Sequence, residues 1–292
     1  MENDNNISQP KLFRPPQGGE VITYQGCKYY LGSQIGQGYF GAVYSCRDEW
    51  GNNLVAKVIL PQNRTYEEVR ENWLNELQSL VTLRHPNITF VYDAFECEDT
   101  FYLIIERCFS TLTDLINLPG LVGEVWLLPV ARCLLQAIDF IHGNNYVHKD
   151  IHPGNVLSLY IKDELLPSTH QALVFKVGDL GISRLESDMD IFNTILAKWM
   201  VPPEFLKPQE FGVIGKQVDI YHAGLVLLSL LLGYIPTFKQ EEILAGRPRQ
   251  LAESLTSSYK SAIAKALRRH TLCRTQTARE FWQDLNKGQP NL

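Results

Sequence analysis

The chain has 292 residues, a hydrophobic share of 45% and a formal net charge of −5. This length suits one globular domain and little else, and the acidic balance argues against nucleic-acid binding, which needs a basic surface. Six cysteines are scattered without a Cys-x-x-Cys pair, so zinc and disulfide frameworks are not indicated and reduced thiols in the cytoplasm are expected.

Residues 1–27 are expected to form a flexible arm, because prolines and the pair Gly18-Gly19 interrupt them. The polar start of the chain lacks the basic and apolar regions of a signal peptide. An apolar run at residues 223–235 is too short for a membrane span, which takes about 17–25 residues. We therefore expect no membrane contact and interpret the run as a buried helix.

A glycine-rich pattern occupies residues 35–43, with Gly36, Gly38 and Gly41 followed by Val43. Glycines at this spacing let a hairpin lie close over phosphates, because side chains there would block the approach of the backbone. A dinucleotide fingerprint has similar glycines but joins a strand to a helix. Here both flanks resemble strands, so the pattern predicts a phosphate-covering hairpin.

The next apolar strand is interrupted only by Lys57, whose ammonium is therefore expected to point into a site. A helix follows from a predicted capping box at Thr65, with helical apolar spacing at Leu74, Leu77, Leu80 and Val81. Glu76 on this helix is the expected partner of Lys57. Glu67, Glu68 and Glu71 are read as solvated acids of the first turns.

The most informative stretch is His148-Lys149-Asp150-Ile151-His152-Pro153-Gly154-Asn155, followed later by Asp179-Leu180-Gly181. Phosphoryl transfer from a metal-bound nucleotide needs one carboxylate that orients the attacking hydroxyl. It also needs an amide and a second carboxylate that hold divalent metal ions. Together with the upstream glycines and lysine, this order predicts a phosphotransferase.

At this point the chain resembles the eukaryotic-like protein kinase family over residues 29–285. Later landmarks fit as well, namely Pro202-Pro203-Glu204, Asp219 at the start of a buried helix, and Arg274 as the partner of Glu204. The resemblance implies an α+β, bilobal protein-kinase fold. Residues 28–107 would form a mostly antiparallel β lobe with one key helix, and residues 108–292 a mainly helical lobe.

The resemblance also implies roles for individual residues, with ATP and Mg²⁺ as cofactors. Asp150, Lys57, Glu76 and His152 would be catalytic, and Asn155 and Asp179 would bind magnesium. Leu80, Val91, His148 and Leu180 would form an apolar stack anchored by Asp219. The expected ATP-binding residues are Ile35, Gly36, Gly38, Gly41, Val43, Ala56, Lys57, Ile105, Glu106, Cys108 and Leu157.

Three departures from the family pattern concern the acceptor. His152 replaces the lysine of Ser/Thr kinases, Lys149 replaces the usual arginine and loses its bidentate fork, and Lys198-Trp199-Met200 resembles a tyrosine-kinase segment. Protein hydroxyls are the expected acceptors, Ser/Thr before Tyr, and the chain itself can be among them. Phosphorylation between Asp179 and Glu204, at Thr194 or Ser187, is expected to activate the protein. Residues 158–176 exceed the family pattern by roughly ten residues and are interpreted as a surface hairpin.

Two alternatives stay open. The string His-x-Asp-x-His-Pro-Gly-Asn also resembles the small-molecule kinases that phosphorylate aminoglycosides and choline. A pseudokinase scaffold is the other alternative, although Lys57, Asp150 and Asp179 are all present. The sequence does not indicate an oligomeric state.

Overall fold

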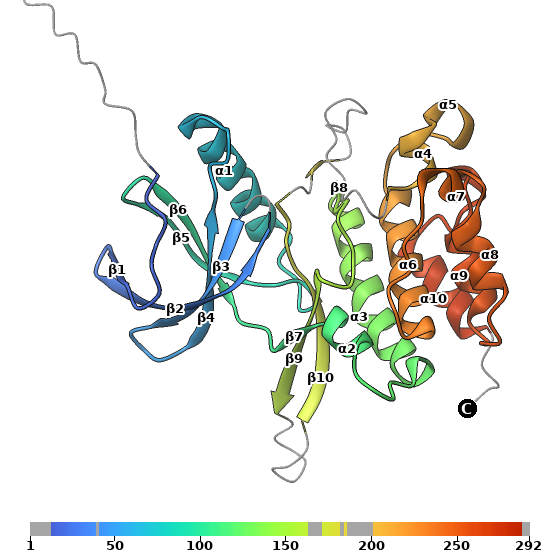
Figure 1. The fold of residues 1–292 in the computed structure, drawn as a ribbon, viewed down its shortest axis with the longest axis horizontal. Helices are drawn as coiled ribbons and strands as arrows, with labels where there is room; N and C mark the ends of the chain where they lie inside the picture. Colours follow the sequence, from blue (N-terminus) through green and yellow to red (C-terminus); the bar gives the residue numbers. More distant parts are fainter. Residues whose placement is uncertain (1–12, 39–40, 163–170, 182–183, 186–200, 288–292) are drawn as a thin grey trace, which may run out of the picture. The chain divides into compact units, whose positions relative to one another are not determined.

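The computed structural model describes residues 13–38, 41–162, 171–181, 184–185 and 201–287. The chain forms two compact units, shown in Figure 1: one of Met1–Val81 with Phe90–Arg107, and one of Thr82–Thr89 with Cys108–Leu292. The first contains an antiparallel sheet and one helix, and the second is mainly helical. The α+β class expected from the sequence, with a mostly antiparallel β unit that holds one helix and a mainly helical unit, is therefore confirmed.

The first unit is a six-stranded sheet in the order β1-β2-β3-β4-β6-β5, with every neighbouring pair antiparallel. Stacked rings of Tyr24, Tyr29, Phe95 and Tyr102 lie in its core, where aromatic side chains bury the most apolar surface. Its elements are β1 Val21–Tyr24, β2 Cys27–Gln37, β3 Gly41–Asp48, β4 Asn53–Ile59, α1 Tyr66–Thr82, β5 Val91–Cys97 and β6 Thr100–Glu106.

The prediction of a flexible arm over residues 1–27 was wrong at its C-terminal end. Strand β1 pairs with β2 from Val21 opposite Tyr30 to Tyr24 opposite Cys27. The Gly19 amide also donates to the Leu31 carbonyl at 2.8 Å. The glycines taken as breakers instead turn the chain into the sheet, since Gly19 has a φ of 89°.

Helix α1 begins with the predicted capping box. The Thr65 amide donates to the Glu68 carboxylate at 2.7 Å, and the Glu68 amide donates to the Thr65 hydroxyl at 3.3 Å. The predicted apolar face was only partly right, because Leu74 and Val81 are exposed. The buried face instead includes Glu76 and Leu80.

The segment Thr82–Thr89, which we had assigned to the β lobe, belongs to the second unit. Its backbone pairs with β10, since the Val177 amide donates to the Asn87 carbonyl at 2.8 Å and the Thr89 amide to the Val177 carbonyl at 3.0 Å. The Asn87 side chain adds a bond to the Phe175 carbonyl at 2.9 Å. These bonds fix the segment to the strand that leads to Asp179.

The second unit is built around two apolar helices, α3 and α6, which pack together. In α6, residues 218–230 are all buried, which confirms the buried helix predicted for the apolar run. The helix starts earlier than predicted and ends at Leu232, because Gly233 adopts a left-handed conformation at a φ of 70°. The elements of this unit are β7 Ser110–Thr111, α2 Leu112–Ile116, α3 Gly123–Gly143, β8 Tyr146–Val147, β9 Val156–Lys162, β10 Gln171–Val177, β11 Arg184–Leu185, α4 Pro203–Leu206, α5 Pro208–Phe211, α6 Gln217–Leu232, α7 Gln240–Leu244, α8 Arg247–Glu253, α9 Lys260–Ala266, the 3₁₀ turn Thr271–Cys273 and α10 Ala278–Asn286.

Among the described residues, α3 is the one helix long and apolar enough to cross a membrane by length and composition. It packs against α6, α10 and β10, and Leu127, Leu134 and Ile141 are among its buried residues. A core helix of a folded domain passes the same test, and the contacts of α3 are those of such a helix.

Strands β9 and β10 pair along their whole length, from Val156 opposite Val177 to Lys162 opposite Gln171. The two legs of the predicted hairpin over residues 158–176 are therefore present. Its tip at residues 163–170 lies outside the described residues.

A buried arginine organises the C-terminal part of the second unit. The Arg274 guanidinium makes a bidentate pair with Glu204 at 2.6 and 2.7 Å, and neither side chain is exposed. Its remaining N–H groups donate to the carbonyls of Gln217, Arg268 and Arg269, so all five donors are satisfied. This is the pair that the sequence predicted.

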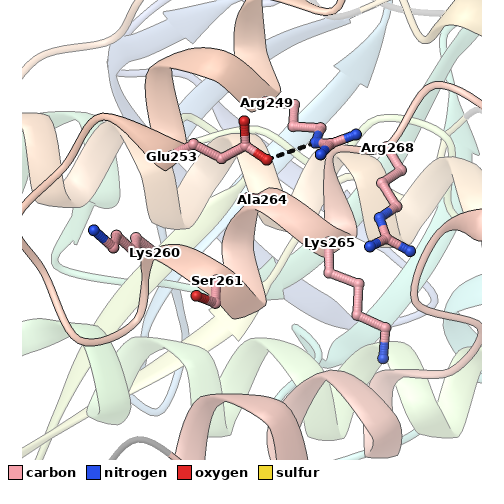
Figure 2. A pocket seen from close by; sticks show the side chains of 7 residues that line it. All are labelled: Arg249, Glu253, Lys260, Ser261, Ala264, Lys265 and Arg268. Atoms are coloured by element: carbon pink, nitrogen blue, oxygen red, sulfur yellow. Dashed lines mark hydrogen bonds and ion pairs between the residues drawn. The ribbon is translucent and has the colours of Figure 1, made fainter.

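Surface ion pairs lie within and between the helices further along the chain. Figure 2 shows a small hollow between α8 and α9 where Arg249 donates to Glu253 at 2.8 Å. Lys265, on the same α9 face, is held by Glu280 at 2.6 Å and Asp284 at 2.7 Å, which ties α9 to α10. Hydrogen bonds to these two acids raise the pKa of Lys265.

The buried Glu204–Arg274 pair and the exposed Arg249–Glu253 pair should contribute differently to the free energy of unfolding. Glu204→Gln leaves the Arg274 charge buried without its counter-ion, which should lower the free energy of unfolding by about 3–5 kcal/mol. Glu253→Gln is the control, because an exposed pair contributes about 0.5 kcal/mol. Urea unfolding followed by circular dichroism measures both. Equal losses in the two variants would contradict the role given to the buried pair.

Candidate functional site

The glycine pattern forms the predicted hairpin. Strands β2 and β3 pair antiparallel with Gly36 opposite Val43, and the Gly38 amide donates to the Gly41 carbonyl at 2.8 Å. A Cβ on Gly41 would lie 3.1 Å from the Val58 carbonyl oxygen and 3.3 Å from Cε of Lys57. Glycine there lets the hairpin pack against the lysine stem. The dinucleotide interpretation is excluded, because a strand follows the glycines rather than a helix.

Lys57 and Glu76 form the predicted ion pair. The Lys57 ammonium on β4 lies 2.6 Å from the Glu76 carboxylate on α1, and their side chains are only 11% and 5% exposed. Glu71, five residues earlier on α1, is exposed. A buried pair with good hydrogen-bond geometry fixes the position of an ammonium that would otherwise have to be solvated.

The end of β6 carries the residues expected to contact an adenine base. Ile105 is half-buried, and Glu106 makes two bonds to Phe90, with its amide donating at 2.9 Å and its carboxylate accepting at 2.8 Å. These bonds hold the strand end in place. Cys108, the first residue of the next segment, is half-buried in the second unit.

In the second unit, the amide of Asn155 fixes Asp150. Asn155 Nδ2 donates to the Asp150 carbonyl at 3.0 Å and to its Oδ2 at 3.1 Å. The other carboxylate oxygen, Oδ1, is buried and has no hydrogen-bond partner among the described residues. A buried carboxylate oxygen without a donor is costly, and it is the kind of atom that accepts a proton from a bound hydroxyl.

The backbone of this segment is fixed by the buried Asp219 at the start of α6. Its Oδ2 accepts the His148 amide at 2.9 Å and its Oδ1 accepts the Lys149 amide at 2.8 Å. His142 Nε2 lies 2.9 Å from Oδ2. Burial alone raises the pKa of Asp219, but the hydrogen bond and charge of His142 outweigh it and the pKa is lowered.

Asp179 follows β10, which leads it to the segment of residues 148–155. The Gly178 amide donates to the Asn155 carbonyl at 2.8 Å, and His148 Nε2 lies 3.1 Å from the Gly178 carbonyl oxygen. Asp179 has a φ of 57°, a left-handed conformation that is uncommon for residues other than glycine. Such strain is typical of functional positions.

His152 is turned toward the carboxylate of Asp150. Its Nδ1 accepts the Gly154 amide at 3.1 Å, so the neutral ring carries its hydrogen on Nε2, which lies 3.8 Å from Asp150 Oδ2. A Cβ on Gly154 would come within 2.9 Å of the ring. Burial lowers the pKa of His152, opposed by the charges of Asp150 and Asp179, so the ring is neutral at pH 7.

The oxygens offered here fit a magnesium ion that shares phosphate ligands. Magnesium is usually bound through one or two carboxylates together with substrate phosphates and waters. Because Nδ2 of Asn155 donates to Asp150, the amide oxygen Oδ1 of Asn155 is the atom left for a cation. Asp179 supplies a carboxylate. Within the described residues no three His, Cys, Asp or Glu side chains form a metal cage, so nucleotide phosphates would have to complete the coordination.

The remaining predicted residues belong to different parts of the chain. Ile35 is exposed, Val43 is half-buried and Ala56 is fully buried in the first unit, whereas Leu157 lies on β9 of the second. Their roles at a base stay predictions. Ser187, Thr194 and Lys198-Trp199-Met200 lie outside the described residues.

Sequence reasoning missed two positioning residues, Asn87 and His142. Both act through hydrogen bonds to residues far along the chain, Phe175 and Asp219. The available signals were weak: an asparagine after His85-Pro86, and a histidine at the end of an apolar helix.

Comparison with known proteins supports this arrangement. The family described as protein kinase domain matches residues 29–291. The chain is 32% identical over 211 residues to a probable serine/threonine-protein kinase zyg-1 of Caenorhabditis briggsae, covering 70% of this chain and 27% of the relative. It is 29% identical to mouse cyclin-dependent kinase-like 4, covering 70% and 57%, and 27% identical to Arabidopsis thaliana calcium-dependent protein kinase 21, covering 82% and 45%. The chain thus spans between a quarter and three fifths of these relatives' lengths.

The surroundings of His152 predict its titration. Its imidazole should titrate below 6.5, because burial disfavours the charged ring. In Asp150→Asn the midpoint should fall further, since a carboxylate that favours the imidazolium has been removed. Proton NMR of the ring Cε1–H, assigned with His152→Gln, measures both midpoints. Asp139→Asn, a distant carboxylate on α3, should leave the midpoint unchanged, and a rise in Asp150→Asn would contradict the geometry.

Proposed function

Because the chain belongs to the protein kinase family, we propose that it transfers the γ-phosphate of ATP to the side-chain hydroxyl of a protein. The observation that carries the proposal is the unpartnered, buried Oδ1 of Asp150, held in place by Asn155. An oxygen so placed accepts the proton of an attacking hydroxyl. A pseudokinase scaffold would have no use for an oriented carboxylate whose free oxygen costs stability.

The residues of the first unit serve nucleotide binding in this proposal. Lys57, fixed by Glu76, contacts the α- and β-phosphates, and the glycine hairpin brings backbone amides to the phosphates. The Glu106 carbonyl and the Cys108 amide would bind the base behind Ile105. These assignments rest on the family pattern.

Magnesium would be held by Asn155 and Asp179 together with the phosphates, and when bound it neutralises charge on the transferring group. The chain's own residues then orient the reactants. Asp150 holds the acceptor hydroxyl and takes its proton. His152 presents Nε2–H beside Asp150 and can donate a hydrogen bond without bringing a charge.

We propose serine or threonine as the acceptor. The relative zyg-1 is named a probable serine/threonine-protein kinase. Pro153 matches the proline of that class, whereas the Ala-Ala-Arg pattern of tyrosine kinases is missing. The buried Glu204–Arg274 pair also belongs to the large lobe of protein kinases rather than to small-molecule kinases. A cytoplasmic location is proposed as well, supported by six free cysteines.

The direct test is phosphotransfer by Asp150→Asn and Asp179→Asn. Loss of a general base costs about 10²–10⁴ in rate, and loss of a metal ligand should in addition weaken Mg-ATP binding in Asp179→Asn alone. Transfer of label from radiolabelled ATP measures both the rate and the choice of acceptor. The acceptors offered are serine, threonine and tyrosine peptides, choline and an aminoglycoside. Calorimetry measures the affinity for ATP. Asp139→Asn is the control. Near wild-type turnover in either variant would overturn the catalytic assignment, and labelling of choline or the aminoglycoside alone would favour a small-molecule kinase.

A second test concerns the lysine. Glu76→Gln removes the counter-ion that fixes Lys57 and should lower kcat/KM by more than tenfold, since a misplaced catalytic group costs about a hundredfold in the rate. Glu71→Gln, exposed on the same helix, makes the same chemical change and should keep the wild-type rate. Steady-state kinetics on one peptide compares them. Equal effects would show that the pair does not position Lys57 for catalysis.

A further inference from the structure

A hollow of about 550 Å³ lies in the second unit between α3 and α10, outside the candidate site. Helix α3 contributes Arg132, Gln136 and Phe140, which recur every four residues and therefore share one face. Helix α10 contributes Trp282, and the segment after α1 contributes His85. Volumes of about 300–1,000 Å³ are typical of small-molecule sites.

The walls of the hollow are flat and aromatic. The rings of Phe140 and His85 are stacked, with centroids 5.0 Å apart and planes 28° apart. Phe140 and Trp282 are only partly buried, so both offer ring surface to a ligand. Burial of the ring and the charge of Lys176 lower the pKa of His85, which keeps this wall uncharged at neutral pH.

The polar groups of the hollow favour an anion. Arg132 is exposed and has no ion pair or hydrogen bond among the described residues, whereas Asp139 is paired with Arg279 at 3.3 Å. His85 Nδ1 accepts the Asn87 amide at 3.1 Å, so the neutral ring carries its hydrogen on Nε2. One free cation and one neutral donor therefore stand beside an aromatic wall.

We propose that this hollow binds a small planar aromatic acid, with its ring against Phe140, His85 and Trp282 and its carboxylate on Arg132. A guanidinium forms bidentate hydrogen bonds with a carboxylate, which fixes the orientation of the ring. The hollow between α8 and α9 in Figure 2 offers a contrast. It measures about 220 Å³, has no aromatic lining, and its Arg249 and Lys265 are already paired with acids.

The experiment uses 2-naphthoate as the probe on the full chain, without ATP, so its outcome does not depend on kinase activity. The chain has five tryptophans, whose indole N–H signals are resolved by NMR, and Trp282→Phe identifies the one in the hollow. Titration of 2-naphthoate should shift the Trp282 signal selectively, with a dissociation constant between about 10 µM and 1 mM for a ligand of this size.

Two controls separate the ring from the charge. Arg132→Gln should weaken 2-naphthoate binding about tenfold or more, because a charge-assisted contact is lost, while Arg70→Gln, an exposed arginine of α1, should not. Naphthalene-2-methanol, which has the same ring without the charge, should bind equally weakly to the wild type and to Arg132→Gln. The weakest dissociation constant expected is ~1 mM, so about 5 mM 2-naphthoate should nearly saturate the hollow. An unmoved Trp282 signal at that concentration would overturn the proposal, and so would equal affinity of the wild type and Arg132→Gln.

Discussion

The carboxylate of Asp219 lies at the start of α6, fully excluded from water, and both of its oxygens accept backbone N–H groups of the catalytic segment. A buried charge is costly unless it is fully hydrogen-bonded, and the two amides together with His142 supply the donors. The bond from Lys149 also holds that residue at a φ of 70°, a conformation that costs about 1–3 kcal/mol elsewhere. The turn that directs Asp150 therefore depends on one buried acid of α6.

The need of a buried charge for hydrogen-bond partners also accounts for the fixed positions of Lys57 and Asp150. In the first unit, Glu76 holds Lys57 in a setting where neither side chain is solvated. In the second, Asn155 holds Asp150 through Nδ2 and leaves Oδ1 without a donor. Each unit thus presents one preorganised charge, and such preorganisation is what electrostatic catalysis requires. Neither arrangement needs a substrate to form.

The sequence predicted a contact where a charged residue lies in an apolar segment and therefore needs a partner of opposite charge. A lysine inside an apolar strand needs an acid, and Glu76 met that need. The sequence could not predict that Leu74 and Val81 would be exposed. Helical spacing shows which residues share a face, but not how much of that face other elements bury. The arm boundary failed for a related reason, since Gly18 and Gly19 break a helix but also serve a turn into a strand. Asn87 and His142 depend on partners far along the chain, Phe175 and Asp219, which no local pattern encodes.

His152 shows how a departure from a family pattern acquires a physical meaning. A lysine at this position would bring a mobile positive charge to the catalytic segment. The imidazole instead has Nδ1 fixed by the Gly154 amide, and Gly154 cannot carry a Cβ without meeting the ring. Burial keeps the ring neutral, so the segment has one positive charge fewer beside Asp150 than a lysine would give it. If the proposed phosphotransfer is correct, His152 adds no charge to stabilise the transferring phosphoryl group, and that stabilisation would have to come from other groups.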